Sequence, residues 1–166
     1  LDDQLPQTLA LVNGVLRGYR CNAFSPMDGC VCAWFDYGKP ETVAFRADMD
    51  ALPLQEATGA PYSSRHPGRT HACGHDGHTA IALSLAQWLA GRTEALARNV
   101  LVIFQPSEET TGGADRLCRT GILDEYHVTR IFGLQLWPGL PEGAVYSRPG
   151  ALMARSNEIK IGRAHV

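Results

Sequence analysis

The sequence lacks any apolar run long enough to cross a membrane. A transmembrane helix needs roughly 20 consecutive apolar residues, whereas the run Val100 to Phe104 is far shorter. The opening Leu1-Asp2-Asp3-Gln4 also lacks the basic start and apolar core of a secretion signal. We therefore expect a soluble protein with no membrane partner.

The sequence also lacks a large excess of charge of one sign and an even number of cysteines. Lys and Arg number 15 against 17 Asp and Glu, for a net charge of -2, so there is no broad basic field to attract nucleic acid. The five cysteines are an odd number without a repeating spacing, which argues against a disulfide framework and for a reducing compartment. These features predict a cytoplasmic protein without a nucleic-acid partner.

The 166 residues, 45% of them hydrophobic, are enough for one globular domain with a sizeable core. Apolar spacing predicts helices over Thr8 to Gly18 and Thr79 to Leu89. The continuous apolar run Val100 to Phe104 is typical of a central strand covered on both faces, and Ile131 to Leu136 is predicted as a second one. A helix over Gly113 to Arg119 between them gives the strand, helix, strand alternation of an α/β sheet.

Two short β-prone runs precede this region. Cys30 to Phe35 and Thr42 to Phe45 are separated by the turn-rich segment Asp36-Tyr37-Gly38-Lys39-Pro40, which predicts a hairpin. The segment Ala57 to Thr70 has no periodicity and is predicted to be an exposed loop.

The densest polar cluster is His71-Ala72-Cys73-Gly74-His75-Asp76-Gly77-His78. It places one thiol, three imidazoles and one carboxylate within eight residues, a set that favours zinc, manganese or a similar ion. His66 and His71 are interpreted as solvated loop histidines.

A pair of carboxylates directly follows the predicted central strand, in Gln105-Pro106-Ser107-Glu108-Glu109. Acidic residues are also common in the first turn of a helix, because they interact favourably with the helix dipole. In the functional interpretation the two carboxylates have different roles: one ligates a metal and the other acts as a general base on water. The sequence around these residues leaves both interpretations open.

Arg46-Ala47-Asp48-Met49-Asp50-Ala51-Leu52-Pro53 follows another predicted strand. Asp48 and Asp50 lie on the same side of an extended chain, where one could hold a ligating histidine in its productive tautomer. Aspartates in such turns are also ordinary turn formers. Three acidic or histidine-rich clusters each follow a predicted strand or precede a predicted helix. Chance seldom produces such an arrangement, which favours a functional site.

Four motifs occur in order: RADMDALP (46–53), HACGHDGHTA (71–80), IFQPSEETTGG (103–113) and GLQLWP (133–138). On these motifs the chain, from about Cys30 to its end, resembles the metal-dependent amidohydrolases of the aminoacylase, hippurate hydrolase and auxin-conjugate hydrolase group. These enzymes are relatives of the carboxypeptidase G-type peptidases.

The resemblance implies two divalent metal ions, zinc or manganese with cobalt also possible, sharing a bridging water. It implies Cys73 and His75 as metal ligands, Glu109 as a further ligand and Glu108 as the general acid/base. Asp50 and Asp76 would be supporting carboxylates, Asp50 within the catalytic set.

The chain departs from the group at the GLHLWP-like motif, where the family's ligating histidine is replaced by Gln135. An amide oxygen is a weaker ligand than imidazole, so one metal is expected to be weakly held or missing. By the same resemblance, His165 would reach the neighbouring subunit's site of a homodimer and stabilise the oxyanion.

The resemblance also implies the architecture. We expect a zinc-peptidase-like three-layer α/β domain with a mixed, largely parallel sheet, its partial catalytic portion spanning residues 1–155. Residues 156–166 would begin an inserted lid and dimerisation domain, with the chain truncated there.

The expected function is hydrolysis of the amide bond of N-acyl amino acids or small peptide-like substrates. The activity is expected of the full protein, and whether this chain alone has it is left open, because the resemblance covers only part of the catalytic domain. The alternatives are a degenerate or truncated metal-binding module without activity, or a related deacetylase or dipeptidase.

Overall fold

The structure is a computed structural model that describes residues 5–153. The predicted site residue His165 and the predicted lid segment 156–166 lie outside this range. The chain divides into two compact units, residues 1–136 and residues 137–166. The described part of the second unit, 137–153, has turns and bends but neither helix nor strand. No helix in the described range is long and apolar enough to cross a membrane.

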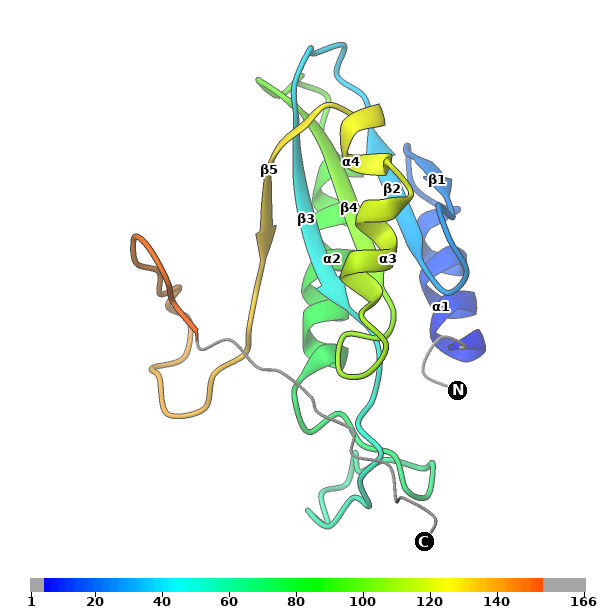
Figure 1. Ribbon diagram of the computed structural model, residues 1–166, viewed down its shortest axis with the longest axis vertical. Coiled ribbons are helices and arrows are strands. Elements are labelled where there is room, and N and C mark those ends of the chain that lie inside the picture. Colours follow the sequence, from blue (N-terminus) through cyan, green and yellow to red (C-terminus); the bar gives the residue numbers. More distant parts are fainter. Residues whose placement is uncertain (1–4, 154–166) are drawn as a thin grey trace, which may run out of the picture. The chain divides into compact units, whose positions relative to one another are not determined.

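The first unit is built on a five-stranded mixed sheet in the order β1-β2-β4-β3-β5 (Figure 1). The strands are β1 (Asn22–Phe24), β2 (Val31–Phe35), β3 (Thr42–Asp48), β4 (Asn99–Gln105) and β5 (Val128–Gly133). β3, β4 and β5 run parallel, whereas β1 and β2 join antiparallel on the β4 side. This arrangement confirms the predicted α/β class with a mixed sheet.

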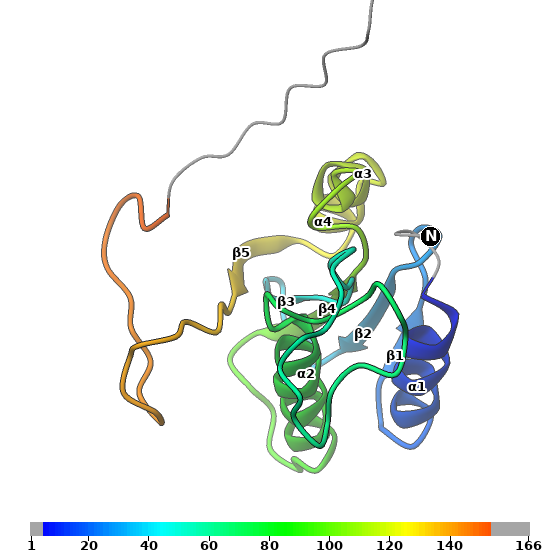
Figure 2. The same ribbon diagram turned by 90° about the horizontal axis from the view of Figure 1, so that it is seen from below.

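Helices cover both faces of the sheet, which gives three layers (Figure 2). α1 (Pro6–Leu16) and α2 (His75–Ala90) lie on one face, and α3 (Gly113–Arg119) and α4 (Ile122–Glu125) lie on the other. Because side chains alternate along a strand, each strand feeds both cores. Val102 and Phe104 of β4 pack toward α1 and α2, and Leu101 and Ile103 pack in the cluster that contains Leu117 of α3.

β4 is the centre of the sheet, and all seven of its residues are buried. It pairs with β3 on one edge and with β2 on the other, and helices cover both of its faces. Its continuous apolar run is therefore explained by burial on every side. The prediction of a central strand here is confirmed.

The predicted hairpin is wrong. β2 and β3 are not neighbours, because β4 lies between them and pairs with both. The turn-rich segment that joins β2 to β3 therefore carries the chain past β4, whose backbone N–H and C=O groups need a partner strand on both edges. Short-range turn signals could not reveal this, because the inserted strand comes more than 50 residues later.

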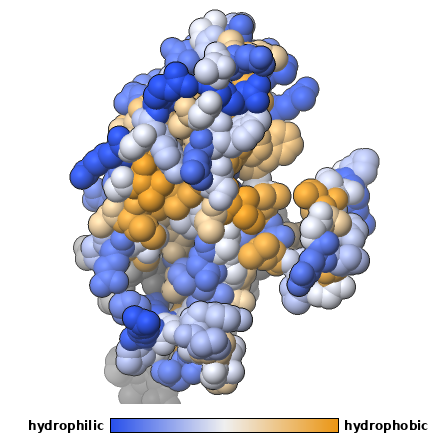
Figure 3. All heavy atoms as spheres, turned by 180° about the vertical axis from the view of Figure 1, so that it is seen from behind, coloured by the Kyte–Doolittle hydropathy of each residue, from blue (hydrophilic) through white to orange (hydrophobic). Residues whose placement is uncertain are grey.

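The second predicted central strand is also misplaced. It forms as β5, three residues earlier than expected, and at the edge of the sheet. Ile131 and Phe132 are each 50% exposed. Apolar side chains also gather on the face seen from behind in Figure 3. The exposed large apolar residues of the described range also include Leu11 of α1 and Trp88 of α2.

The connections at the carboxyl ends of the parallel strands leave toward opposite faces. The chain goes from β3 to α2 on one face and from β4 to α3 on the other (Figure 2). Adjacent strands with diverging connections open a crevice at their carboxyl ends, which is where α/β sheets bind ligands. The three polar motifs of the sequence meet at this crevice.

Candidate metal centre

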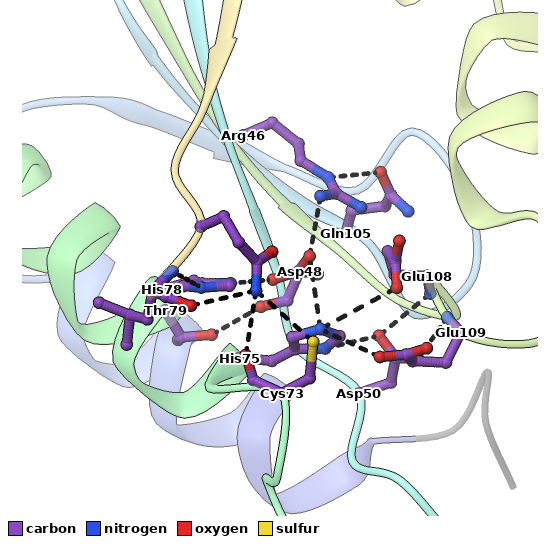
Figure 4. A network of polar contacts seen from close by, with 12 residues as sticks. Arg46, Asp48, Asp50, Cys73, His75, His78, Thr79, Gln105, Glu108 and Glu109 are labelled. Carbon is purple, nitrogen blue, oxygen red and sulfur yellow. Dashed lines mark hydrogen bonds and ion pairs between the residues drawn. The ribbon is translucent and has the colours of Figure 1, made fainter. Parts of the chain in front are cut away.

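Four segments bring polar side chains together beyond the ends of β3, β4 and β5 (Figure 4). The end of β3 contributes Asp48 and the residues after it contribute Asp50, whereas the start of α2 carries His75 and His78 with Cys73 just before it. The segment after β4 contributes Glu108 and Glu109, and Gln135 follows β5. The structure thus brings the three polar motifs and Gln135 together at one end of the sheet.

His75 is buried in the cluster without a hydrogen bond. Its side chain is 2% exposed, and neither ring nitrogen has a hydrogen-bond partner. Four carboxylates surround the ring: Nδ1 lies 3.4 Å from Asp50, and Nε2 lies 3.6 Å from Asp48, 3.6 Å from Glu109 and 4.0 Å from Glu108. A buried polar group without a hydrogen bond costs free energy. An imidazole in this state therefore indicates that its lone pair binds a ligand such as a metal ion.

Cys73, His75 and Glu109 form a group that suits a metal ion. One ligand atom from each lies within 4.8 Å of the others. Thiolate, imidazole and carboxylate together are a donor set that zinc accepts, and the carboxylate also suits manganese. The orphaned nitrogens of His75 therefore fit a divalent ion at this position.

A second group, Asp48, His75 and His78, also has ligand atoms within 4.8 Å of one another. We call this group closed, because Asp48 and His78 are already hydrogen-bonded within the protein. Asp48 Oδ1 lies 2.6 Å from Nδ1 of His78, and Asp48 Oδ2 accepts a hydrogen bond of 2.8 Å from Arg46. Nε2 of His78 accepts the backbone N–H of Leu136 at 2.9 Å. Since protein donors already engage these lone pairs, we assign His78 no metal-ligating role.

Asp50 shapes the loop that carries the two glutamates. It is 2% exposed, and its oxygens accept the backbone N–H groups of Glu108 at 3.0 Å and Glu109 at 3.1 Å. The backbone turns toward it at Ser107, whose φ of 57° lies in the left-handed region. Burial opposes ionisation, but the His75 ring and these two N–H groups outweigh it and lower the pKa of Asp50.

The same loop closes on Gly113 at the start of α3. A Cβ atom there would lie 1.9 Å from the backbone oxygen of Pro106, so only glycine fits. The N–H of Gly113 donates to the backbone oxygen of Ser107 at 2.9 Å. The two glutamates thus sit in a loop whose shape is fixed from both ends.

Burial and neighbouring charges in the cluster shift the pKa of three further groups. Burial and the adjacent charge of Glu109 raise the pKa of Glu108, whose side chain is 40% exposed. Burial alone would lower the pKa of His75, but Asp50 and the other carboxylates outweigh it and raise the pKa. Burial raises the pKa of the Cys73 thiol, against which the Gln135 amide acts. A cation among these groups would relieve the repulsion between the carboxylates.

Gln135 lies beside Cys73. Its Nε2 donates to the backbone oxygen of Cys73 at 3.3 Å and to Sγ at 3.6 Å. Oxygen and nitrogen of an amide are assigned from the hydrogen-bond network, so a half-turn of this group would present the oxygen instead. The neighbourhood needed for a ligand at position 135 is therefore present.

Two predicted residues stand apart from the cluster. Asp76 is exposed and accepts the N–H of Gly77, and no described ion pair joins it to the carboxylates above. His71 is exposed, as is His66, which agrees with their interpretation as loop histidines.

Sequence reasoning assigned no role to Arg46, Gln105 or His78. Arg46 bridges Asp48 and Gln105, which pair in register across β3 and β4. His78 follows His75 by three residues and so shares its face of α2. That helical spacing is the signal that could have placed His78 near the site, but the start of the helix had first to be located at His75.

The fold and the cluster define an α/β protein with a candidate metal centre at the carboxyl ends of its parallel strands. Residues 44–165 match the sequence profile of peptidase family M20/M25/M40. The chain belongs to this family, which confirms the resemblance drawn from the four motifs.

Similar proteins agree with this assignment. N-acetyldiaminopimelate deacetylase of Exiguobacterium sibiricum is 42% identical over 120 residues, 72% of this chain and 32% of that protein. A dinuclear metal-binding peptidase of the M20 family from Bacillus subtilis has a TM-score of 0.78 and 35% identity, over 85% of this chain and 40% of that one. The crystal structure of a protein from methicillin-resistant Staphylococcus aureus has a TM-score of 0.83 and 36% sequence identity. The match covers 90% of this chain and 39% of that one. The chain thus spans 32% to 40% of the length of these relatives.

Proposed function

We propose that the protein hydrolyses the amide bond of N-acyl amino acids or small peptide-like substrates, using two divalent metal ions. The observation that carries this proposal is the open group of Cys73, His75 and Glu109, in which neither nitrogen of a buried imidazole makes a hydrogen bond. The name of the Exiguobacterium relative supports an N-acetylated amino acid as the first substrate to try.

Cys73, His75 and Glu109 would hold the metal, with Gln135 as a weaker neutral donor. Bound divalent ions supply Lewis-acid polarisation of a carbonyl and lower the pKa of water. The metals we propose are zinc or manganese, with cobalt as a possible substitute, because the thiolate favours zinc and the carboxylates tolerate manganese.

Glu108 is our proposed general acid/base. Its carboxylate lies on the same side of the cluster as Glu109 but remains 40% exposed, open to a substrate (Figure 4). It would take a proton from the attacking water and return it to the nitrogen of the leaving amine. Asp50 touches the backbone of Glu108 and Glu109 and acts as a positioning residue in this scheme.

The remaining expectations complete the proposal. The protein would be cytoplasmic and would bind neither nucleic acid nor membrane. At full length it would form a homodimer in which His165 reaches the neighbouring site and stabilises the oxyanion.

A second candidate is a degenerate metal-binding module without activity. Gln135 favours it, because this neutral amide is a weaker metal ligand than the imidazole that the family has at this position.

The test of the proposal is Glu108→Gln in the full-length protein. Turnover of N-acetyl and N-benzoyl amino acids should fall by about 10²- to 10⁴-fold, the usual contribution of general acid–base catalysis, while metal content is unchanged. Glu94→Gln is the matched control, since that side chain is 86% exposed. Retained turnover in Glu108→Gln would remove Glu108 from the mechanism, and an inactive wild type with bound metal would favour the module.

A further inference from the structure

A short segment after β5, residues 134–136, is attached to the start of α2 at two points. The first is polar: the backbone N–H of Leu136 donates to Nε2 of His78 at 2.9 Å. This hydrogen bond joins residues 58 positions apart and is partly buried. It ties the chain leaving β5 to the helix that carries the metal-ligand candidates.

The second attachment is apolar and depends on two glycines. A Cβ atom at Gly77 would lie 2.5 Å from Cδ1 of Leu136, and one at Gly74 would lie 3.2 Å from the same atom. The side chain of Leu136, which is 46% exposed, therefore lies over a shallow notch formed where both positions lack a side chain. Packing thus favours glycine at position 77, and at position 74 the φ of 87° favours glycine as well.

The hydrogen bonds of His78 fix which of its nitrogens carries the proton. Because Nε2 accepts an N–H, the ring proton is on Nδ1, which faces Oδ1 of Asp48 at 2.6 Å. The other oxygen of Asp48 accepts from Arg46, which balances the carboxylate charge. The ring of His78 is 1% exposed, so this arrangement is sheltered from water.

Gln135 lies between β5 and this attachment, and its side chain reaches Cys73. We propose that His78 is a positioning residue that, through Leu136, sets residue 135 against Cys73. The part of this inference that concerns metal rests on the proposed function, whereas the part that concerns the segment does not. His78 acts through its neighbour and touches neither metal nor substrate.

Hydrogen exchange of the Leu136 amide in the full-length protein tests the attachment without reference to metal or activity. His78→Phe removes the acceptor, and exchange should quicken roughly tenfold, as expected for one lost hydrogen bond. His78→Gln keeps an acceptor of similar reach and should restore most of the protection. His66→Phe, at an exposed loop position, is the control. Unchanged exchange in His78→Phe would overturn the proposal.

A second pair of variants covers the case in which His78→Phe does not fold. Gly77→Ala should displace Leu136 and also quicken exchange, and adding Leu136→Ala should relieve the overlap. Gly14→Ala is the matched control, because a Cβ there has no neighbour within 4 Å. Exchange in Gly77→Ala equal to that of Gly14→Ala would contradict the notch.

Metal affinity then distinguishes positioning from general stabilisation. Gln135→His alone should tighten binding of the weaker metal about tenfold, and most of this gain should be lost when His78→Phe is also present. If His78 only stabilises the fold, melting temperature falls but the gain stays the same, which overturns the proposal. If Cys73→Ser leaves metal content unchanged, the proposed function fails while the exchange result still decides the attachment.

Discussion

Replacing Asp50 by asparagine tests whether one buried carboxylate shapes the loop that carries Glu108 and Glu109. Asparagine has the same shape but keeps only one oxygen, whereas Asp50 accepts a backbone N–H with each of its two. One hydrogen bond to a charged group is lost, worth about 1.5–3 kcal/mol, and a partly buried N–H then faces the new NH₂ group unsatisfied, at about 1–3 kcal/mol. We expect a loss of about 3 kcal/mol in the free energy of unfolding.

Thermal unfolding of the full-length, metal-free protein measures this loss. At roughly 2 °C per kcal/mol for a larger domain, Asp50→Asn should melt about 6 °C below the wild type. Asp36→Asn is the matched control, because Asp36 also accepts a backbone N–H, from Gly38 at 2.7 Å, but at an exposed position. Its melting temperature should change by at most about 1 °C. Equal melting of the two variants would refute the assignment of Asp50 as the organiser of this loop.

Two further substitutions test the loop and the weak ligand. Gly113→Ala places Cβ against the backbone of Pro106 and should destabilise the protein by about 2 kcal/mol or more in a melting experiment. Gly14→Ala, in open space on α1, should instead stabilise by about 0.5–1 kcal/mol, and the same sign for both would be contrary to this reasoning. Gln135→His should strengthen metal binding about tenfold in a competition titration with a chelator, since imidazole is the better donor. No gain there would mean that position 135 does not serve the metal.

Local patterns in the sequence predicted much of the fold correctly. The apolar run at β4 gave both its position and its burial, because a strand covered on all sides has no polar face to interrupt it. The edge position of β5 could not be predicted in this way. A short apolar run looks the same whether or not further chain covers it, and only pairing with β3 places it.

The candidate site was predictable to the extent that its chemistry is written in contiguous motifs. Cys73, His75 and Glu109 stood out by residue type and come together as expected. The role of His78 could not be predicted, because its partners Asp48 and Leu136 are distant in sequence and its hydrogen bonds depend on the sheet. Sequence alone therefore could not separate the open donor group from the closed one.

The most direct test of the central claim is elemental analysis of the full-length protein after dialysis against metal-free buffer. Wild type and Cys118→Ser, which changes an exposed cysteine, should retain about one or two divalent ions per chain. Cys73→Ser should retain clearly less, since a hydroxyl replaces a thiolate ligand. Equal metal content in Cys73→Ser and Cys118→Ser would contradict the assignment of this cluster as the metal centre.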